Sequence, residues 1–93
     1  MPLSYIYRHN GLNFTIKNPP NNPQKLYDAY QGNTYLCSFG SINNNHFRDK
    51  LGLYKQLDHR DIFKRNLWLQ EYSLVKDNND PFNPIFWEKI FLY

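Results

Sequence analysis

The chain has 93 residues, a formal net charge of +3 and an aromatic content of 18%. This length limits it to one domain, and so small a body buries only a modest share of its surface. A single cysteine, Cys37, excludes an intramolecular disulfide, and no apolar run approaches the about 18 residues of a membrane span. The N-terminus lacks the charged head and apolar core of a signal peptide, so we expect a soluble protein made inside the cell.

Residues 4–17 carry the clearest local pattern. Asn10-Gly11 is a strong signal for a two-residue hairpin turn, because a type I′ turn needs positive φ at both positions. Folding about this turn places three cross-strand pairs on one apolar face: His9 with Leu12, Tyr7 with Phe14, and Tyr5 with Ile16. The opposite face is mostly polar, so we expect a sheet covered on one side.

Residues 18–24, NPPNNPQ, follow this hairpin and contain three prolines and three asparagines. Neither a sheet ladder nor a helix interior accommodates such a segment, so we predict a linker in largely extended conformation.

Residues 25–39 predict a second hairpin about the turn Gly32-Asn33. Its expected pairs are Tyr30 with Tyr35, Asp28 with Cys37, and Leu26 with Phe39. We expect Cys37 to be a small buried hydrophobe rather than a nucleophile, because a lone cysteine inside a strand usually has that role.

Two helices are expected in the second half of the chain, after a short helix at 44–50. Asp58 is a good N-cap for the main helix, which we predict from His59 to about Ser73, with Asp61 in its first turn. Its apolar positions form a broad stripe, which Trp68 widens: Ile62, Phe63, Leu67, Leu69, Tyr72 and Leu74.

Asn83 as cap and Pro84 at the first position predict a short C-terminal helix. We therefore predict an α+β fold: two antiparallel β-hairpins followed by one main helix and a short C-terminal helix. It forms a single small domain over 1–93, made of the N-terminal hairpin (1–17), the Pro/Asn linker (18–24), and the second hairpin with the helices (25–93).

Five residues in the middle of the chain have side chains that can bind a divalent metal: His46, Asp49, Asp58, His59 and Asp61. A hydrolase site with one metal could use two carboxylates and two imidazoles. Their spacing is not diagnostic, however, and helix capping with ion pairs to nearby Arg and Lys explains the same residues. We predict no catalytic residue, no metal and no cofactor, and keep a metal-dependent hydrolase as an alternative.

Five basic residues of the same region are candidate contacts to anions: Arg48, Lys50, Arg60, Lys64 and Arg65. With Tyr and Phe rings that stack on bases, they could form a surface for nucleic acid. The charges do not form a run, and eight acidic residues dilute them. A basic nucleic-acid-binding protein is therefore an alternative, beside the simpler explanation of a solvated polar rim.

Aromatic side chains are concentrated in the terminal segments, outside the expected body of hairpins and main helix. Interface cores are enriched in such side chains, so we predict that eight of them bind a protein partner. These are Tyr5, Tyr7, Phe14, Phe82, Phe86, Trp87, Phe91 and Tyr93. The apolar stretch 85–93 must pack on the domain, on a neighbouring chain or on a membrane surface.

Residues 25–93 contain a series of short sequence elements in a fixed order. These are Tyr27-Asp28-Ala29-Tyr30, Phe39-Gly40, His46, Asp49-Lys50, Gly52-Leu53-Tyr54, Leu57-Asp58-His59, Asp61, Arg65, Pro81, Pro84, Trp87 and Phe91-Leu92-Tyr93. This order resembles a family of short basic proteins encoded by large nucleocytoplasmic DNA viruses of eukaryotes. The basic cluster that such proteins carry after the Asp61 element thins here to Lys64 and Arg65. That difference favours protein contacts over nucleic acid.

The resemblance brings no enzymatic activity with it. It implies a viral protein of the virion, and we expect a non-enzymatic structural role as a minor capsid or cement component of a large double-stranded DNA virus. The expected partners are other capsid or virion proteins, and the expected locations are the virion and, during assembly, the host cytoplasm.

Overall fold

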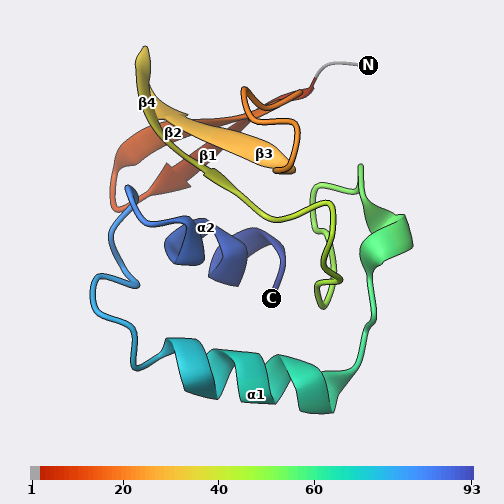
Figure 1. Cartoon of the computed structure of the whole chain (residues 1–93). Coiled ribbons are helices and arrows are strands. Elements are labelled where there is room, and N and C mark those ends of the chain that lie inside the picture. The colour runs from red at the N-terminus through yellow and green to blue at the C-terminus, as the bar shows by residue number, and fades with distance from the viewer. Residues whose placement is uncertain (1–2) are drawn as a thin grey trace.

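The structure, a computed structural model, describes residues 3–93. A four-stranded antiparallel sheet precedes two helices, which confirms the α+β class. The elements are β1 (Leu3–His9), β2 (Leu12–Asn18), β3 (Tyr27–Gln31), β4 (Thr34–Phe39), a 3-10 turn η1 (Lys55–Leu57), α1 (Ile62–Tyr72) and α2 (Pro84–Phe91). Figure 1 shows α2 between the sheet and α1, so the elements form three layers.

The first hairpin forms as predicted. Asn10 and Gly11 have φ of 51° and 79°, the positive values that a type I′ turn requires. All three predicted cross-strand pairs are present in the register of β1 and β2. The hairpin therefore follows from its turn and its alternating side chains.

The two hairpins merge into a single sheet, because β2 pairs with β3 and the strand order is β1-β2-β3-β4. The Pro/Asn segment between them is not extended as predicted: residues 19–25 form bends and turns that fold back on the domain. The side-chain amide of Asn18 donates hydrogen bonds to the carbonyl of Leu26 at 2.8 Å and to the hydroxyl of Tyr54 at 2.7 Å. The linker thus belongs to the folded body.

The register of the second hairpin is only partly as predicted. Tyr30 lies opposite Tyr35, but the two other predicted pairs are wrong. The register shifts between Ala29 and Tyr30, which leaves Leu36 as an extra residue in β4. A β-bulge of this kind adds one residue to one strand and displaces every later pair. The observed pairs are Ala29 with Cys37, Asp28 with Ser38, and Tyr27 with Phe39.

The C-terminal helix α2 forms the centre of the core. Asn83 caps it through a hydrogen bond from the N–H of Ile85, and Pro84 opens it, as predicted. Trp87 is fully buried against the sheet, where its ring meets those of Phe14 and Phe39. Its indole N–H donates to the carbonyl of Pro81 at 2.7 Å, so the one polar atom of this side chain is also satisfied.

The segment before α1 differs from the prediction. Residues 44–50 contain no helix; instead His46 pairs with Asp58 in a parallel β-bridge. Asp58 does not cap the main helix, because its carboxylate is buried against His46. Arg60 has a positive φ of 55°, which is incompatible with a helix there. The helix starts at Ile62 instead and is capped by Asp61, which accepts hydrogen bonds from two backbone N–H groups of the first turn.

Candidate functional site

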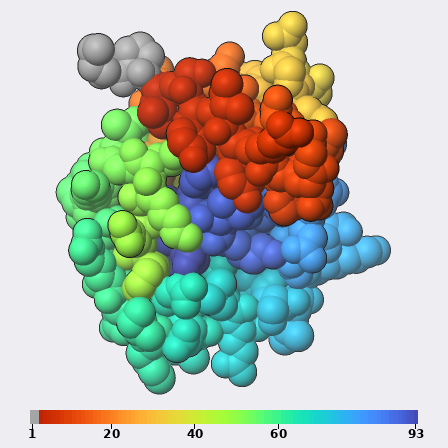
Figure 2. Space-filling model, turned by 180° about the vertical axis from the view of Figure 1, so that it is seen from behind, coloured from red at the N-terminus to blue at the C-terminus, as the bar shows by residue number. Residues whose placement is uncertain are grey.

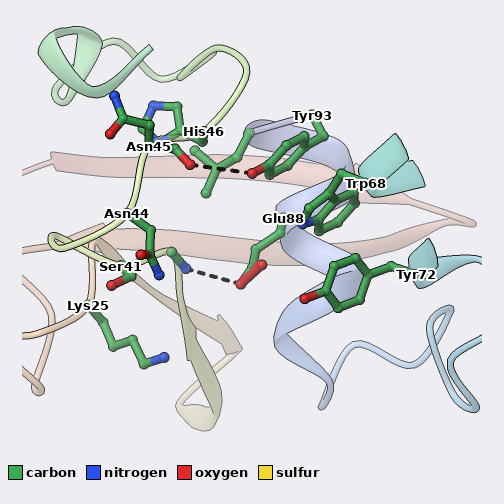
Figure 3. Close-up of a pocket in the computed structure, with 11 residues that line it drawn as sticks. Lys25, Ser41, Asn44, Asn45, His46, Trp68, Tyr72, Glu88 and Tyr93 are labelled. Carbon is green, nitrogen blue, oxygen red and sulfur yellow. Dashed lines mark hydrogen bonds between the residues drawn. The ribbon is translucent and has the colours of Figure 1, made fainter. Parts of the chain in front are cut away.

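A cavity of about 210 Å³ lies between the loop 40–46, α1 and α2. Figure 3 shows Lys25 and Glu88 directed into it from opposite sides, with the hydroxyl of Tyr72 on the α1 side. The wall also includes Ser41, Asn44, Asn45, His46, Trp68 and Tyr93. Most of these groups donate or accept hydrogen bonds, so the cavity suits a small polar molecule or a polar side chain better than an apolar ligand.

Glu88 is the unusual group of this cavity. The N–H of Gly40 donates to its Oε2 at a long 3.4 Å. Burial raises the pKa of Glu88, while the Gly40 N–H and the charge of Lys25 oppose this change. Within residues 3–93, only two pairs of acidic and basic side chains lie within salt-bridge distance: Asp58 with His46, and Asp58 with Arg60. Lys25 and Glu88 therefore face the same cavity without pairing.

Gly40 has a structural reason to be glycine. Its φ is +77°, and a Cβ at this position would lie 2.7 Å from Cδ1 of the buried Leu26. Any other residue would be strained and would collide with the core. Gly40 therefore lets the loop 40–46 pass close to Leu26 while its N–H points at Glu88.

Glu88→Gln should change how stability depends on pH. Because burial raises the pKa of Glu88 above its ordinary 4.5, the folded state holds this proton more tightly than the unfolded chain. This group's contribution to stability is complete below that ordinary value and is lost as pH rises through the raised pKa. We expect the variant to be at least as stable as the original at about pH 7, with the two converging near pH 3.5.

Urea unfolding of both proteins across this pH range measures the effect as a change in midpoint. Equal losses of stability in the variant at every pH would contradict it. In that case the carboxylate would be a structural hydrogen-bond acceptor and burial would not penalise its charge.

The five candidate metal ligands do not converge. Only one pair of their side chains is in contact, His46 and Asp58, with Nε2 and Oδ1 2.7 Å apart. The Asp49 carboxylate is occupied by other donors, Asp61 caps α1, and His59 accepts a hydrogen bond from the N–H of Asp61. Within residues 3–93, no group of three or more His, Cys, Asp or Glu side chains could hold a metal ion.

Comparisons with protein-family models, with curated proteins and with solved structures found no significant match. Function must therefore be inferred from the chain's own surfaces. In the part of the chain that the structure describes, no helix is long and apolar enough to cross a membrane.

The predicted partner surface is wrong for half of its residues. Phe14, Phe86, Trp87 and Phe91 are at most 5% exposed and form the domain's own core. Tyr7 and Tyr93 are half-buried. Of the eight, only Tyr5 and Phe82 are exposed, at 44% and 59%. The aromatic C-terminus therefore packs on the domain itself. This is one of the three surfaces considered from the sequence, the others being a neighbouring chain and a membrane.

The exposed apolar surface lies instead on α1. No residue of this helix is buried. The exposed fractions of Ile62, Phe63 and Leu67 are 58%, 70% and 51%. Leu74, just beyond the helix, is 87% exposed. In Figure 2 this segment (cyan) lies at the surface, below the blue C-terminal segment.

An aromatic stack holds α1 to the rest of the domain. The rings of Trp68 and Tyr93 are parallel with centroids 3.9 Å apart, and Tyr72 lies 4.6 Å from Trp68. Arg65 adds a hydrogen bond from Nε to the carbonyl of Tyr93 at 2.7 Å. The inner face of α1 is thus aromatic, and its broad apolar stripe leaves a second face open to solvent.

Three of the five candidate anion contacts lie near one another. The N–H of Arg48 donates to the carbonyl of Leu92, and the N–H of Lys50 donates to the carbonyl of Phe91. The side chain of Arg65 donates to the carbonyl of Tyr93, so the three basic residues contact three consecutive residues of the C-terminus. Burial lowers the pKa of Lys50, and the charges of Arg65 and Arg48 lower it further. Arg60 and Lys64 are exposed; Arg60 lies 3.9 Å from Asp58.

Cys37 is buried, as predicted. Burial raises the pKa of its thiol to about 12, with the charge of Glu88 adding to the effect. Very little thiolate is present at neutral pH, and the thiolate is the reactive form. Cys37 is therefore a packing residue of β4.

Proposed function

We propose that this chain is a non-enzymatic structural protein, a minor capsid or cement component of a large DNA virus, that works through contacts with neighbouring capsid proteins. The exposed apolar face of α1 carries this proposal. Large exposed apolar patches usually mark contact surfaces, and a cement protein stabilises a joint by burying such surface. The viral origin rests on the resemblance of residues 25–93 to the family described above.

The geometry of α1 supports this role. Phe63 and Leu67 are one helical turn apart and share a face, as do Trp68 and Tyr72. The second pair packs inward on Tyr93, so the first pair points outward and is 51–70% exposed. The inner pair packs on the domain, so the outer pair is free to contact a partner. Such a partner would have a hydrophobic groove that accepts the exposed face of an amphipathic helix, here α1.

The double variant Phe63→Ser, Leu67→Ser tests this function. We expect it to fold with a melting temperature close to that of the original chain, because exposed side chains contribute little to stability. Its incorporation into purified virions should fall at least about tenfold, since central apolar anchors usually carry most of the binding energy. Quantitative mass spectrometry of virions from cells expressing either form measures this ratio.

The control is Leu12→Ser, Leu53→Ser, which removes two side chains that are 50% and 41% exposed elsewhere on the surface. This variant should enter virions normally. Absence of the original chain from purified virions would refute the capsid role. Equal incorporation of both variants would refute α1 as the contact face.

The grouping of Arg48, Lys50 and Arg65 favours a second candidate, a nucleic-acid-binding protein. Clustered cations bind phosphates by releasing counterions, so affinity falls steeply with salt. If this function holds, arbitrary DNA should bind at low salt and lose at least about tenfold in affinity between 50 and 200 mM salt. Fluorescence anisotropy measures this dependence, and no binding at low salt would remove the candidate.

A further inference from the structure

The first strand of the sheet, β1, has a free edge. The strand order places β1 outermost, paired on one side only, with β2. His9 and Leu12 flank the two-residue turn, so this pair exchanges both of its backbone hydrogen bonds across the ladder. The pattern then alternates along the strand. The N–H and C=O groups of Leu3, Tyr5, Tyr7 and His9 face β2, whereas those of Ser4, Ile6 and Arg8 point outward.

These outward groups have no backbone partner within residues 3–93. Their side chains are exposed, and Ile6 is 68% exposed. The opposite edge of the sheet is different, because β4 carries a bulge and packs against α2. In Figure 2 the N-terminal hairpin (red) lies uncovered at the upper surface. An unpaired regular edge of seven residues is a template for another strand.

We propose that β1 pairs antiparallel with β1 of a second copy of this chain, about a two-fold axis at Ile6, to form a continuous sheet across two molecules. In this register, the residues with outward backbone groups meet one another: Ile6 opposite Ile6, and Ser4 opposite Arg8. Tyr5 lies opposite Tyr7, and Leu3 opposite His9. The unpaired groups of one copy therefore find partners on the other.

The sequence of β1 is complementary to itself in this register. No two like charges face each other, because Arg8 meets Ser4 and His9 meets Leu3. The exposed Ile6 covers its own counterpart on the outer face. On the inner face, Tyr5, which is 44% exposed, meets Tyr7, whose ring already packs edge-on against Trp87 and Phe91. A second copy thus provides hydrogen-bond partners for the unpaired backbone groups of the edge and covers Tyr5 and Ile6, the two exposed apolar residues of the strand.

This pairing is independent of the proposed function, which concerns α1 and a different protein. Sedimentation equilibrium of the full chain over a range of concentrations tests it with two matched variants. Ile6→Lys places two lysines opposite each other, which should raise the dimer dissociation constant at least about tenfold. Ile62→Lys makes the same change at another exposed isoleucine, which is 58% exposed on α1, and should leave the constant unchanged.

Amide hydrogen exchange supplies a second measurement, because contacts through α1 would not change the protection of the β1 amides. The amides of Ser4, Ile6 and Arg8 should become more protected as protein concentration rises, and Ile6→Lys should abolish this dependence. A chain that stays monomeric up to about 1 mM would overturn the proposal, because the pairing would be too weak to matter. A dimer that is lost in Ile62→Lys but kept in Ile6→Lys would overturn it too. Virion incorporation of the α1 variant is measured separately and can fail without affecting this result.

Discussion

Trp87→Ala should leave the domain unfolded or close to unfolding. Trp87 is fully buried, and its ring contacts those of Tyr7, Phe14 and Phe39 on three different strands. Removing a buried Trp costs about 3–5 kcal/mol, against a total stability of about 5–15 kcal/mol for a domain. We expect a loss of cooperative thermal unfolding or a fall in midpoint of more than about 12 °C by circular dichroism.

The matched control is Phe82→Ala, which truncates an aromatic residue five positions earlier that is 59% exposed. Its stability should stay within about 0.5 kcal/mol of the original. Near-normal melting of Trp87→Ala would contradict the placement of α2 in the core. The C-terminal aromatic residues would then be available to a partner, as their sequence first suggested.

The features that the sequence predicts correctly each depend on a few adjacent residues. The turn at Asn10-Gly11 needs only two residues with positive φ, and it sets the whole register of the first hairpin. The start of α2 at Asn83-Pro84 is equally local, because cap and first position are neighbours. Such signals do not require knowledge of the rest of the fold.

Most of the wrong predictions depend on contacts beyond the few adjacent residues that the sequence signal involves. Asp58 has the side chain of an N-cap, but His46, twelve residues earlier, binds its carboxylate and Asp61 caps the helix instead. The bulge at Leu36 is not encoded by the turn at Gly32-Asn33. The aromatic tail has the appearance of a surplus in the sequence because its burial depends on residues of β1, β2 and β4.

The candidate cavity could not be predicted for the same reason. Its charged residues, Lys25 and Glu88, are 63 positions apart and meet only because α2 lies against the sheet. The open face of α1 has a signal in the sequence, although no exposed face was predicted there. A stripe as broad as Ile62, Phe63, Leu67, Leu69 and Tyr72 exceeds what one side of a helix can bury, and part of it stays exposed on α1.

Asp49→Ala should cause a second large loss of stability. Asp49 is 2% exposed, and its carboxylate accepts three hydrogen bonds. The donors are the hydroxyl of Tyr27 at 2.7 Å and the N–H groups of Leu51 at 2.9 Å and Tyr54 at 2.8 Å. Each buried donor left without a partner costs about 1–3 kcal/mol, so we expect a loss of about 3–5 kcal/mol by urea unfolding.

Two further variants separate the buried network from a general effect of losing an aspartate. Asp61→Ala removes a carboxylate that also accepts two backbone N–H bonds, but at the exposed start of α1, and should cost about 1 kcal/mol. Tyr27→Phe removes one of the three donors and should cost about 1.5–3 kcal/mol, because that bond ends on a charged group. Equal losses for Asp49→Ala and Asp61→Ala would contradict the network. Burial would then not strengthen these hydrogen bonds, and the segment 46–58 would be held by its β-bridge and by the apolar contacts of Leu51, Tyr54 and Leu57 with the core.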